Sequence, residues 1–276
     1  HRMHDWGFDA EPEESVNGRE IEAMRGKVIG GSSSINVMAY VRGHRGDYDR
    51  WAQKGCTGWS YTDILPYMRR CEDWEGEENP YRGTGGPITT QWAKNEDPLL
   101  DNWSQACVQA GYQLTDDYNG GNPEGFGTSQ STQRGGERCS AAVAYLHPAK
   151  SRPNLTIAAN AYATRILMED NKAVGVEYSQ NGNLVKVHAD REVLVSGGVF
   201  GSPQLLMLSG IGPADHLKDV GIDPVIDLPG VGKNLQDHLG VLVHYTRPEH
   251  GWFRDLMRFD RMAVAMLQAY FFKSGP

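Results

Sequence analysis

The stretch Gly26–Asn36, which reads GKVIGGSSSIN, constrains the fold more than any other part of the chain. Its adjacent glycines, Gly30 and Gly31, permit positive φ angles and leave no Cβ in the way of a ligand. The serine hydroxyls and the amide of Asn36 can both donate and accept hydrogen bonds. Turn amides of this kind can form a concavity that binds an anion. The stretch alone is equally consistent with a polar turn and with one wall of a site for an anionic cofactor.

The overall composition limits the class of protein. The chain has 276 residues, of which 39% are hydrophobic and 22% are charged, and its net charge is −8. These fractions are typical of a soluble globular protein with one large domain or two smaller ones. The acidic balance argues against nucleic acid as the main partner, because phosphate binding needs a concentrated basic face. No apolar run is long enough to cross a bilayer, so we expect no membrane span.

Four cysteines, Cys56, Cys71, Cys107 and Cys139, are widely spaced. None forms a CxxC pair or stands beside a histidine at metal-ligand spacing, so the sequence predicts no metal site. Reduced thiols are typical of a reducing compartment, and we therefore expect a cytoplasmic protein. A secretory leader upstream of His1 stays an open alternative.

Patterns beyond Asn154 predict strands followed by a strand–turn–helix unit. The pair Asn181-Gly182 between two alternating segments is typical of a β-hairpin. Glu192–Ser196 is a short, nearly continuous apolar run, which predicts a buried sheet strand. This run leads into Gly197-Gly198 and then into a helix near Pro203–Leu208. Since α/β sheets place ligands at junctions of this kind, the pattern predicts an α/β fold.

Helix signals are clearest in the first half of the chain. Apolar residues recur at helical spacing within Thr62–Cys71, where Thr62 is the expected N-cap. Asp97-Pro98 predicts the start of a second helix. A late aromatic cluster favours core packing, with the lining of an apolar pocket as the alternative. This cluster consists of Trp252, Phe253, Tyr270, Phe271 and Phe272.

Two long motifs resemble the glucose–methanol–choline (GMC) family of FAD-dependent oxidoreductases. The first covers Gly26–Asp49, with Gly30-Gly31, Ser32-Ser33, Ile35-Asn36, Tyr40, Gly43 and Asp49 at the family's spacings. The second covers Gly198–Gly212, with Ser202-Pro203, Leu205-Leu206 and Ser209-Gly210-Ile211-Gly212. The running pattern of the family also fits Arg152–Leu155, Ala163–Ile166 and Gly232–His238. Motifs of this length and number are far more specific than a single GxGxxG.

The resemblance implies an α/β fold with an incomplete FAD-binding Rossmann-like domain and part of a substrate (cap) domain. The FAD-binding domain would comprise residues 1–45 and 145–240. The partial substrate domain would comprise residues 46–144 and 241–276. The family's opening GxGxxG, which holds the ADP part of FAD, is absent from this sequence.

By the same resemblance, the chain contributes cofactor-binding residues and no catalytic residue. The expected FAD contacts are Gly30, Gly31, Ser32, Ser33, Asn36, Val37, Met38, Ala39 and Ala163. The residues Asn36 to Ala39 would lie along the pyrophosphate and the flavin ring, and the backbone of Ala163 would meet the adenine. A plain turn is the alternative for the first group, and an ordinary buried strand residue is the alternative for Ala163.

The implied reaction is the oxidation of a primary alcohol to the aldehyde by an alcohol oxidase or dehydrogenase. A histidine base takes the hydroxyl proton, hydride passes to flavin N5, and oxygen or another acceptor reoxidises the flavin. The family's catalytic histidine would lie beyond Pro276, so the expected partners are a small-molecule alcohol and the remaining N- and C-terminal parts of the same enzyme. We expect no turnover by these 276 residues alone. A flavin-containing lyase or decarboxylase and a non-catalytic fragment are the alternatives.

Overall fold

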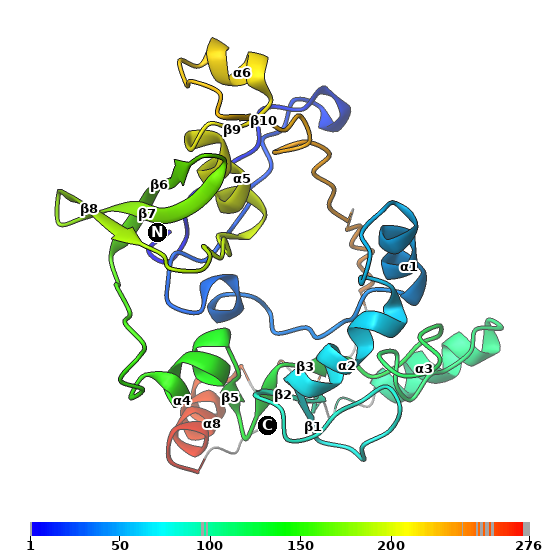
Figure 1. Ribbon diagram of the computed structural model, residues 1–276. Coiled ribbons are helices and arrows are strands. Elements are labelled where there is room, and N and C mark those ends of the chain that lie inside the picture. Colours follow the sequence, from blue (N-terminus) through cyan, green and yellow to red (C-terminus); the bar gives the residue numbers. More distant parts are fainter. Residues whose placement is uncertain are drawn as a thin grey trace. The chain divides into compact units, whose positions relative to one another are not determined.

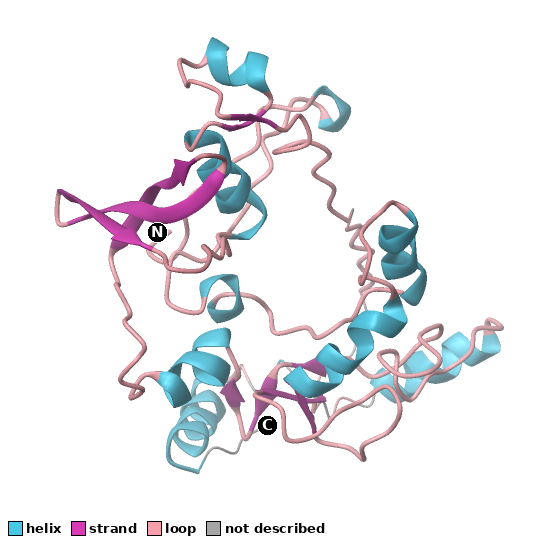
Figure 2. Ribbon diagram, viewed as in Figure 1, coloured by secondary structure: helices cyan, strands magenta, loops and turns pink. Residues whose placement is uncertain are grey.

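The computed structural model describes residues 2–94, 97, 99–238, 240–246, 248, 251, 254 and 257–272. The chain forms two compact units, residues 1–155 with 247–276 and residues 156–246. Both units combine helices with strands (Figure 1, Figure 2), so the predicted α/β class is confirmed. The predicted division into an FAD-binding and a substrate domain concerns ligand roles and stays a prediction.

The first unit holds a small sheet and a separate hairpin. The sheet consists of β1 (Glu72–Trp74), β2 (Ile88–Trp92) and β3 (Gln130–Ser131), in that spatial order. β1 runs parallel to β2, and β3 runs antiparallel to β2. The hairpin pairs β4 (Gln133–Arg134) with β5 (Glu137–Arg138). An isolated antiparallel bridge between Ala39 and Ser131 fastens the glycine-rich segment to β3.

The helical segments of the first unit include three short turns of non-α geometry. The helical segments of this unit, in chain order, are η1 (Glu14–Val16), η2 (Gly31–Ser34), α1 (Arg45–Gln53), α2 (Tyr61–Cys71), α3 (Leu99–Gln109), the π-helix η3 (Ala142–Leu146), α4 (His147–Ala149) and α8 (Phe259–Phe272). Among the described helices, none combines the length and the apolar content that a bilayer crossing requires.

The starts of two helices test the capping predictions. At α2 the hydroxyl of Ser60 accepts from the backbone N–H of Asp63, and the Asp63 carboxylate accepts from the N–H of Ser60. The prediction of Thr62 as N-cap is therefore wrong, because Ser60 has the reciprocal partner that a capping box needs. The predicted start at Asp97 is confirmed, since its carboxylate accepts from the N–H of Leu99 at 3.0 Å. Pro98 lies outside the described residues.

The second unit is built on an antiparallel three-stranded meander. Its elements are β6 (Ala161–Glu169), β7 (Lys172–Gln180), β8 (Asn183–His188), α5 (Gly198–Leu208), β9 (Ile211–Gly212), α6 (Ala214–Asp219) and β10 (Ile226–Asp227). The predicted hairpin is confirmed: Asn181 and Gly182 join β7 to β8 with φ angles of 53° and 80°. Two residues with positive φ match the right-handed twist of the strands that they connect.

One predicted strand is not formed. The segment 192–196 has no assigned strand, and the side chain of Leu194 is 80% exposed. The prediction of a buried strand there is wrong, because a strand needs a pairing partner and none of the described strands pairs with this segment. The predicted glycine turn and helix that follow are present as Gly197 and α5.

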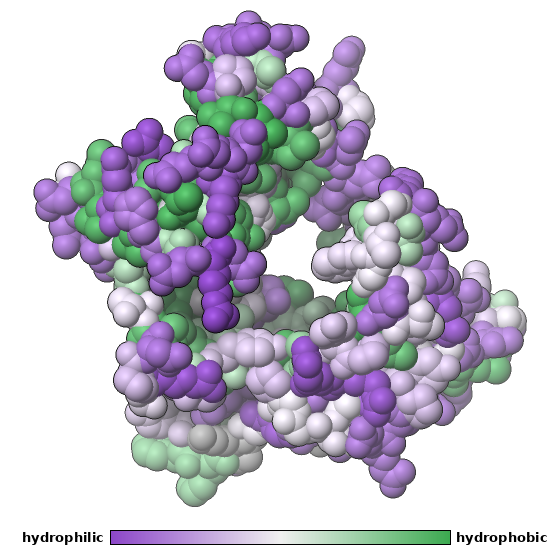
Figure 3. Space-filling view, in the orientation of Figure 1, coloured by the Kyte–Doolittle hydropathy of each residue, from purple (hydrophilic) through white to green (hydrophobic). Residues whose placement is uncertain are grey.

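Three residues of the late aromatic cluster are also not buried. Tyr270, Phe271 and Phe272 of α8 are exposed, and this helix adds apolar surface to the space-filling view (Figure 3). The prediction of core packing is wrong for these three residues, since no described element covers them. Trp252 and Phe253 lie outside the described residues.

The interior of the first unit is largely polar. Four of its side chains are almost completely buried: Arg82, Gln130, Glu72 and Thr90. Buried charges are stable only when they are paired and hydrogen-bonded. Their partners lie next to the glycine-rich segment and therefore belong to the description of the site.

Candidate cofactor-binding site

The segment Gly30–Ala39 contains every predicted cofactor residue except Ala163. Gly30 precedes η2 with φ 94°, in the left-handed region. Gly31 has φ 57°, and nothing lies within 4 Å of the place where a Cβ would stand. After η2 the chain continues as a loop toward α1 (Figure 2). The two glycines thus have the positive φ angles that the sequence predicts.

The serine hydroxyls of η2 hold the shape of this loop. The Ser32 hydroxyl accepts from the N–H of Gly26 at 3.1 Å. The Ser33 hydroxyl donates to the carbonyl of Gly30 at 2.5 Å and accepts from the N–H of Ala141 at 2.9 Å. Because the Ser33 hydroxyl is used twice within the protein, a ligand would meet its backbone before its side chain.

A tight turn follows at Asn36–Met38. The Asn36 side-chain oxygen accepts from the N–H of Met38 at 3.1 Å, and Met38 has φ 63°. A side chain other than glycine in this region costs roughly 1–2 kcal/mol. The carbonyl of Met38 accepts from the N–H of Thr132 at 2.9 Å. The strained turn is therefore held from both sides, a feature that is common at ligand sites.

Arg138, at the end of β5, contacts the same turn. One nitrogen of its guanidinium, Nη1, donates to the Asn36 side-chain oxygen at 2.7 Å, to the Asn36 carbonyl at 2.8 Å and to the Ser33 carbonyl at 3.1 Å. These residues are separated by 102 to 105 positions in the sequence. The contact therefore depends on the fold and fixes the end of η2 and the start of the turn together.

The far end of the loop is anchored at Tyr40. Its N–H donates to the carbonyl of Gln130 at 2.9 Å. Its carbonyl accepts from the hydroxyl of Tyr118 at 3.1 Å and from the side chain of Asn119 at 3.0 Å. Every backbone polar group of Tyr40 is thus satisfied by β3 or by the loop that precedes it.

A buried ion network lies behind this anchor. Glu72 and Arg82 are both fully buried and form a two-point contact, with distances of 2.7 and 3.0 Å. Arg42 donates to the same carboxylate at 2.8 Å, and Arg82 donates to the Asp117 carboxylate at 2.6 Å. Burial raises the pKa of Tyr40, whose hydroxyl lies 3.4 Å from the Arg42 Nε. The network contains two guanidinium groups and two carboxylates, so its charges balance.

Other groups of the loop remain open to a ligand. The Val37 side chain is 87% exposed. Within the described part of the chain, the N–H groups of Gly30 and Val37 make no hydrogen bond. The hydroxyl of Ser131, buried opposite Ala39, also has no partner among the described residues. Free donors, an exposed apolar side chain and a buried hydroxyl without a partner fit a large ligand with both polar and apolar parts.

Comparison with known protein families gives a decisive match. The family model described as GMC oxidoreductase matches residues 12–240. The chain belongs to the GMC oxidoreductase family. The resemblance noted in the sequence is therefore confirmed, and with it the FAD cofactor that this family uses.

Individual GMC relatives show how much of a family member this chain represents. It is 49% identical over 272 residues to an oxygen-dependent choline dehydrogenase of Sinorhizobium fredii, covering 99% of this chain and 49% of that protein. An FAD-dependent oxidoreductase from Chaetomium thermophilum has a TM-score of 0.88 at 28% identity, covering 99% of this chain and 50% of the other. Pyridoxine 4-oxidase from Mesorbium loti has a TM-score of 0.78 at 32% identity, covering 83% and 45%. The chain spans about half the length of the relatives that it matches.

The remaining predicted GMC cofactor residue, Ala163, lies in β6 of the second unit. It pairs with Tyr178 of β7 at an irregularity in the register, which shifts between Ala163 and Arg165. Nearby, Glu177 accepts from Thr164 and Arg165. Burial alone would raise the pKa of Glu177, but these hydrogen bonds lower it overall. The role of Ala163 toward adenine stays a prediction.

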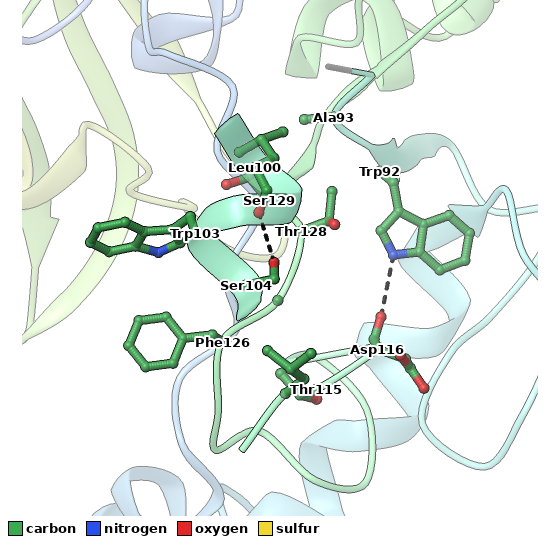
Figure 4. A pocket seen from close by; sticks show the side chains of 12 residues that line it. Trp92, Ala93, Leu100, Trp103, Ser104, Thr115, Asp116, Phe126, Thr128 and Ser129 are labelled. Carbon is green, nitrogen blue, oxygen red and sulfur yellow. Dashed lines mark hydrogen bonds between the residues drawn. The ribbon is translucent and has the colours of Figure 1, made fainter. Parts of the chain in front are cut away.

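The first unit of this GMC chain also has a pocket of about 540 Å³ between the end of β2, α3 and the segment 114–129. Trp92, Trp103 and Phe126 line it, and the indole N–H of Trp92 donates to the Asp116 carbonyl at 3.3 Å (Figure 4). None of the predicted cofactor residues lines this pocket. In the described residues, no group of three or more His, Cys, Asp or Glu side chains could hold a metal ion.

Sequence reasoning missed two contributors to this GMC site, Arg138 and the Arg82 network. Arg138 contacts residues 102 to 105 positions away, and the partners in the Arg82 network are 10 to 35 positions apart. Neither Arg138 nor Arg82 lies in the two long motifs. The only local signal for Arg138 is its place after the glycine pair Gly135-Gly136, which turns the hairpin. A charged side chain at the end of a hairpin does not by itself identify a loop contact.

Proposed function

We propose that this chain forms one wall of the FAD site of a GMC oxidoreductase that oxidises a small primary alcohol to the aldehyde. The observation that carries the proposal is the open face of Gly30–Ala39, where the N–H groups of Gly30 and Val37 have no partner among the described residues and the Val37 side chain is exposed. When bound, FAD supplies the redox chemistry and accepts hydride from the substrate carbon. The chain's own residues hold the cofactor in position.

The loop provides three kinds of contact for this task. Backbone N–H groups near η2 suit the negatively charged part of the cofactor, because turn amides attract anions. Val37 offers an apolar surface for an aromatic ring. The anchors at Tyr40 and Arg138 keep the loop from rearranging when a ligand binds or leaves.

The substrate is proposed to be a small alcohol because the Sinorhizobium fredii relative, which is 49% identical, is named as a choline dehydrogenase. No residue of this chain is assigned as the base that takes the hydroxyl proton. All four cysteines are free. Free thiols support a cytoplasmic location, which is part of the same proposal.

The first test uses the natural protein that carries this sequence. We expect a visible flavin absorption spectrum after purification and release of FAD on denaturation. We further expect oxygen uptake or dye reduction with choline or a simple primary alcohol, with an aldehyde as product. Cleavage of a carbon–carbon bond without net oxidation would instead support a lyase, and a colourless protein would overturn the proposal.

The second test addresses the loop itself. Val37 is 87% exposed, so Val37→Asp should leave folding unchanged while its charge repels an anionic cofactor. The matched control is Leu184→Asp, at an exposed position in β8. We expect loss of bound FAD only in Val37→Asp, and equal FAD content in the two variants would exclude the loop as a cofactor wall.

A further inference from the structure

Arg138 differs from Arg134 and Arg82 in its partners. All three of its acceptors are neutral: two backbone carbonyls and the amide oxygen of Asn36. Its neighbour on the hairpin, Arg134, forms an ion pair with Asp73, and the buried Arg82 pairs with Glu72 and Asp117. No carboxylate of the described residues pairs with Arg138. Its positive charge is therefore uncompensated within the part of the chain that the structure describes.

The contacts of Arg138 do not need this charge. Only Nη1 donates to the loop, and a neutral amide NH₂ group could make the same kind of hydrogen bond. Arg138 is half-buried, and its contact with Ser33 is partly buried. A charge that is partly removed from water without a counter-ion is unfavourable compared with a neutral donor. Holding the shape of the turn explains the hydrogen bonds of the Arg138 Nη1 atom, but it does not explain why this residue carries a positive charge.

We propose that Arg138 is a positioning residue whose charge favours the anionic diphosphate of the cofactor while its Nη1 fixes the turn at Asn36–Met38. This inference rests on the proposed FAD site. The charge acts through the loop, since Arg138 touches the carbonyl and side chain of Asn36 and the carbonyl of Ser33. A cation at this place offsets the negative potential of those oxygens. The loop N–H groups that have no partner among the described residues can then donate to the diphosphate.

The test compares three versions of the natural protein after removal of its flavin: wild type, Arg138→Gln and Arg138→Lys. Glutamine keeps an NH₂ donor without charge, and lysine keeps the charge. Affinity for FAD is measured by quenching of flavin fluorescence at about 50 mM and about 500 mM salt. Riboflavin, which lacks the diphosphate, is the second probe, and Arg134→Gln is the matched control on the same hairpin.

We expect Arg138→Gln to bind FAD about tenfold more weakly at low salt, with a smaller difference at high salt, because salt screens the charge. Arg138→Lys and Arg134→Gln should stay within about threefold of wild type. Affinity for riboflavin should be the same in all four proteins. If Arg138→Gln weakens FAD and riboflavin equally at both salt concentrations, Arg138 only shapes the loop and the inference is wrong. A wild-type protein that binds no FAD overturns the proposed function instead.

Discussion

A cluster of two arginines and the single residue Arg138 hold opposite ends of the same loop, and they differ in their charge partners. The cluster of Arg82, Arg42 and Glu72 is buried behind Tyr40, and each guanidinium has a carboxylate partner. Arg138 is half-buried, its contact with Asn36 is exposed to solvent, and it has no carboxylate partner among the described residues. The difference separates two tasks. The balanced cluster anchors the fold, whereas the unbalanced arginine presents a charge where a ligand is expected.

Removing the shared carboxylate should produce the largest effect. Glu72→Gln leaves Arg42 without its carboxylate and Arg82 with only Asp117, and loss of one member of a buried ion pair costs about 3–5 kcal/mol. We expect this loss in the free energy of unfolding, measured in urea. The matched control is Glu78→Gln, which breaks the exposed Arg69–Glu78 pair and should cost at most about 1 kcal/mol. Equal effects would mean that the buried cluster is not an anchor.

Crowding the start of the loop should produce the next effect. A Cβ on Gly26 would collide with the backbone carbonyl of Gly31, which cannot move without shifting η2. We expect Gly26→Ala to lower the free energy of unfolding by about 1–3 kcal/mol and to weaken FAD binding. Gly201→Ala is the control, because nothing lies within 4 Å of its Cβ position inside α5. This control should be neutral or stabilising by up to about 1 kcal/mol.

Two local signals are interpreted correctly from the sequence, because each depends only on neighbouring residues. The hairpin at Asn181-Gly182 requires only two residues that tolerate positive φ. The start at Asp97 requires only a side-chain acceptor two residues before Leu99. The cap of α2 was misplaced by two residues because both Ser60 and Thr62 can accept, and only the Asp63 partner distinguishes them.

Features that depend on distant partners were not predictable. The segment 192–196 has the composition of a buried strand, but pairing depends on which strands fold beside it. The partners of Arg138 are 102 to 105 positions away, and the carboxylate shared by Arg42 lies 30 positions away. The family motifs identified the loop residues as a group. They gave no indication of which side chains hold the loop and which remain free.

The strained turn at Asn36–Met38 lies between Arg138 and the buried cluster, and substitutions at Met38 test how firmly it is held. Met38 has φ 63°, and a β-branched side chain is a severe outlier in that region. We expect Met38→Val to destabilise the flavin-free protein by about 1–2 kcal/mol and Met38→Asn to be neutral, because asparagine tolerates this conformation. Thermal unfolding of the two variants measures the difference. If valine is as well tolerated as asparagine, the clamps at Asn36 and Thr132 do not enforce the turn.

The smallest effect concerns the pH dependence of the buried cluster. Burial raises the pKa of Tyr40 above its ordinary value of 10.0, and Glu72 adds to this, while Arg42 and Arg82 oppose it. Above pH 10 the unfolded chain loses this phenolic proton before the folded protein does. The unfolded state then binds fewer protons, so the stability that Tyr40 contributes is present below pH 10 and is lost as the pH rises through the folded value.

Tyr40→Phe should therefore flatten the decline of unfolding free energy above pH 10 and change it by less than about 1 kcal/mol at pH 7. The long contact of 3.4 Å to Arg42 explains the small effect at neutral pH. Tyr67→Phe, at an exposed position of α2, is the control and should leave the decline unchanged. Since Arg138 has no tyrosine partner among its contacts, Arg138→Gln should also leave it unchanged. An equal response in all three variants would mean that alkaline unfolding does not start at the buried cluster.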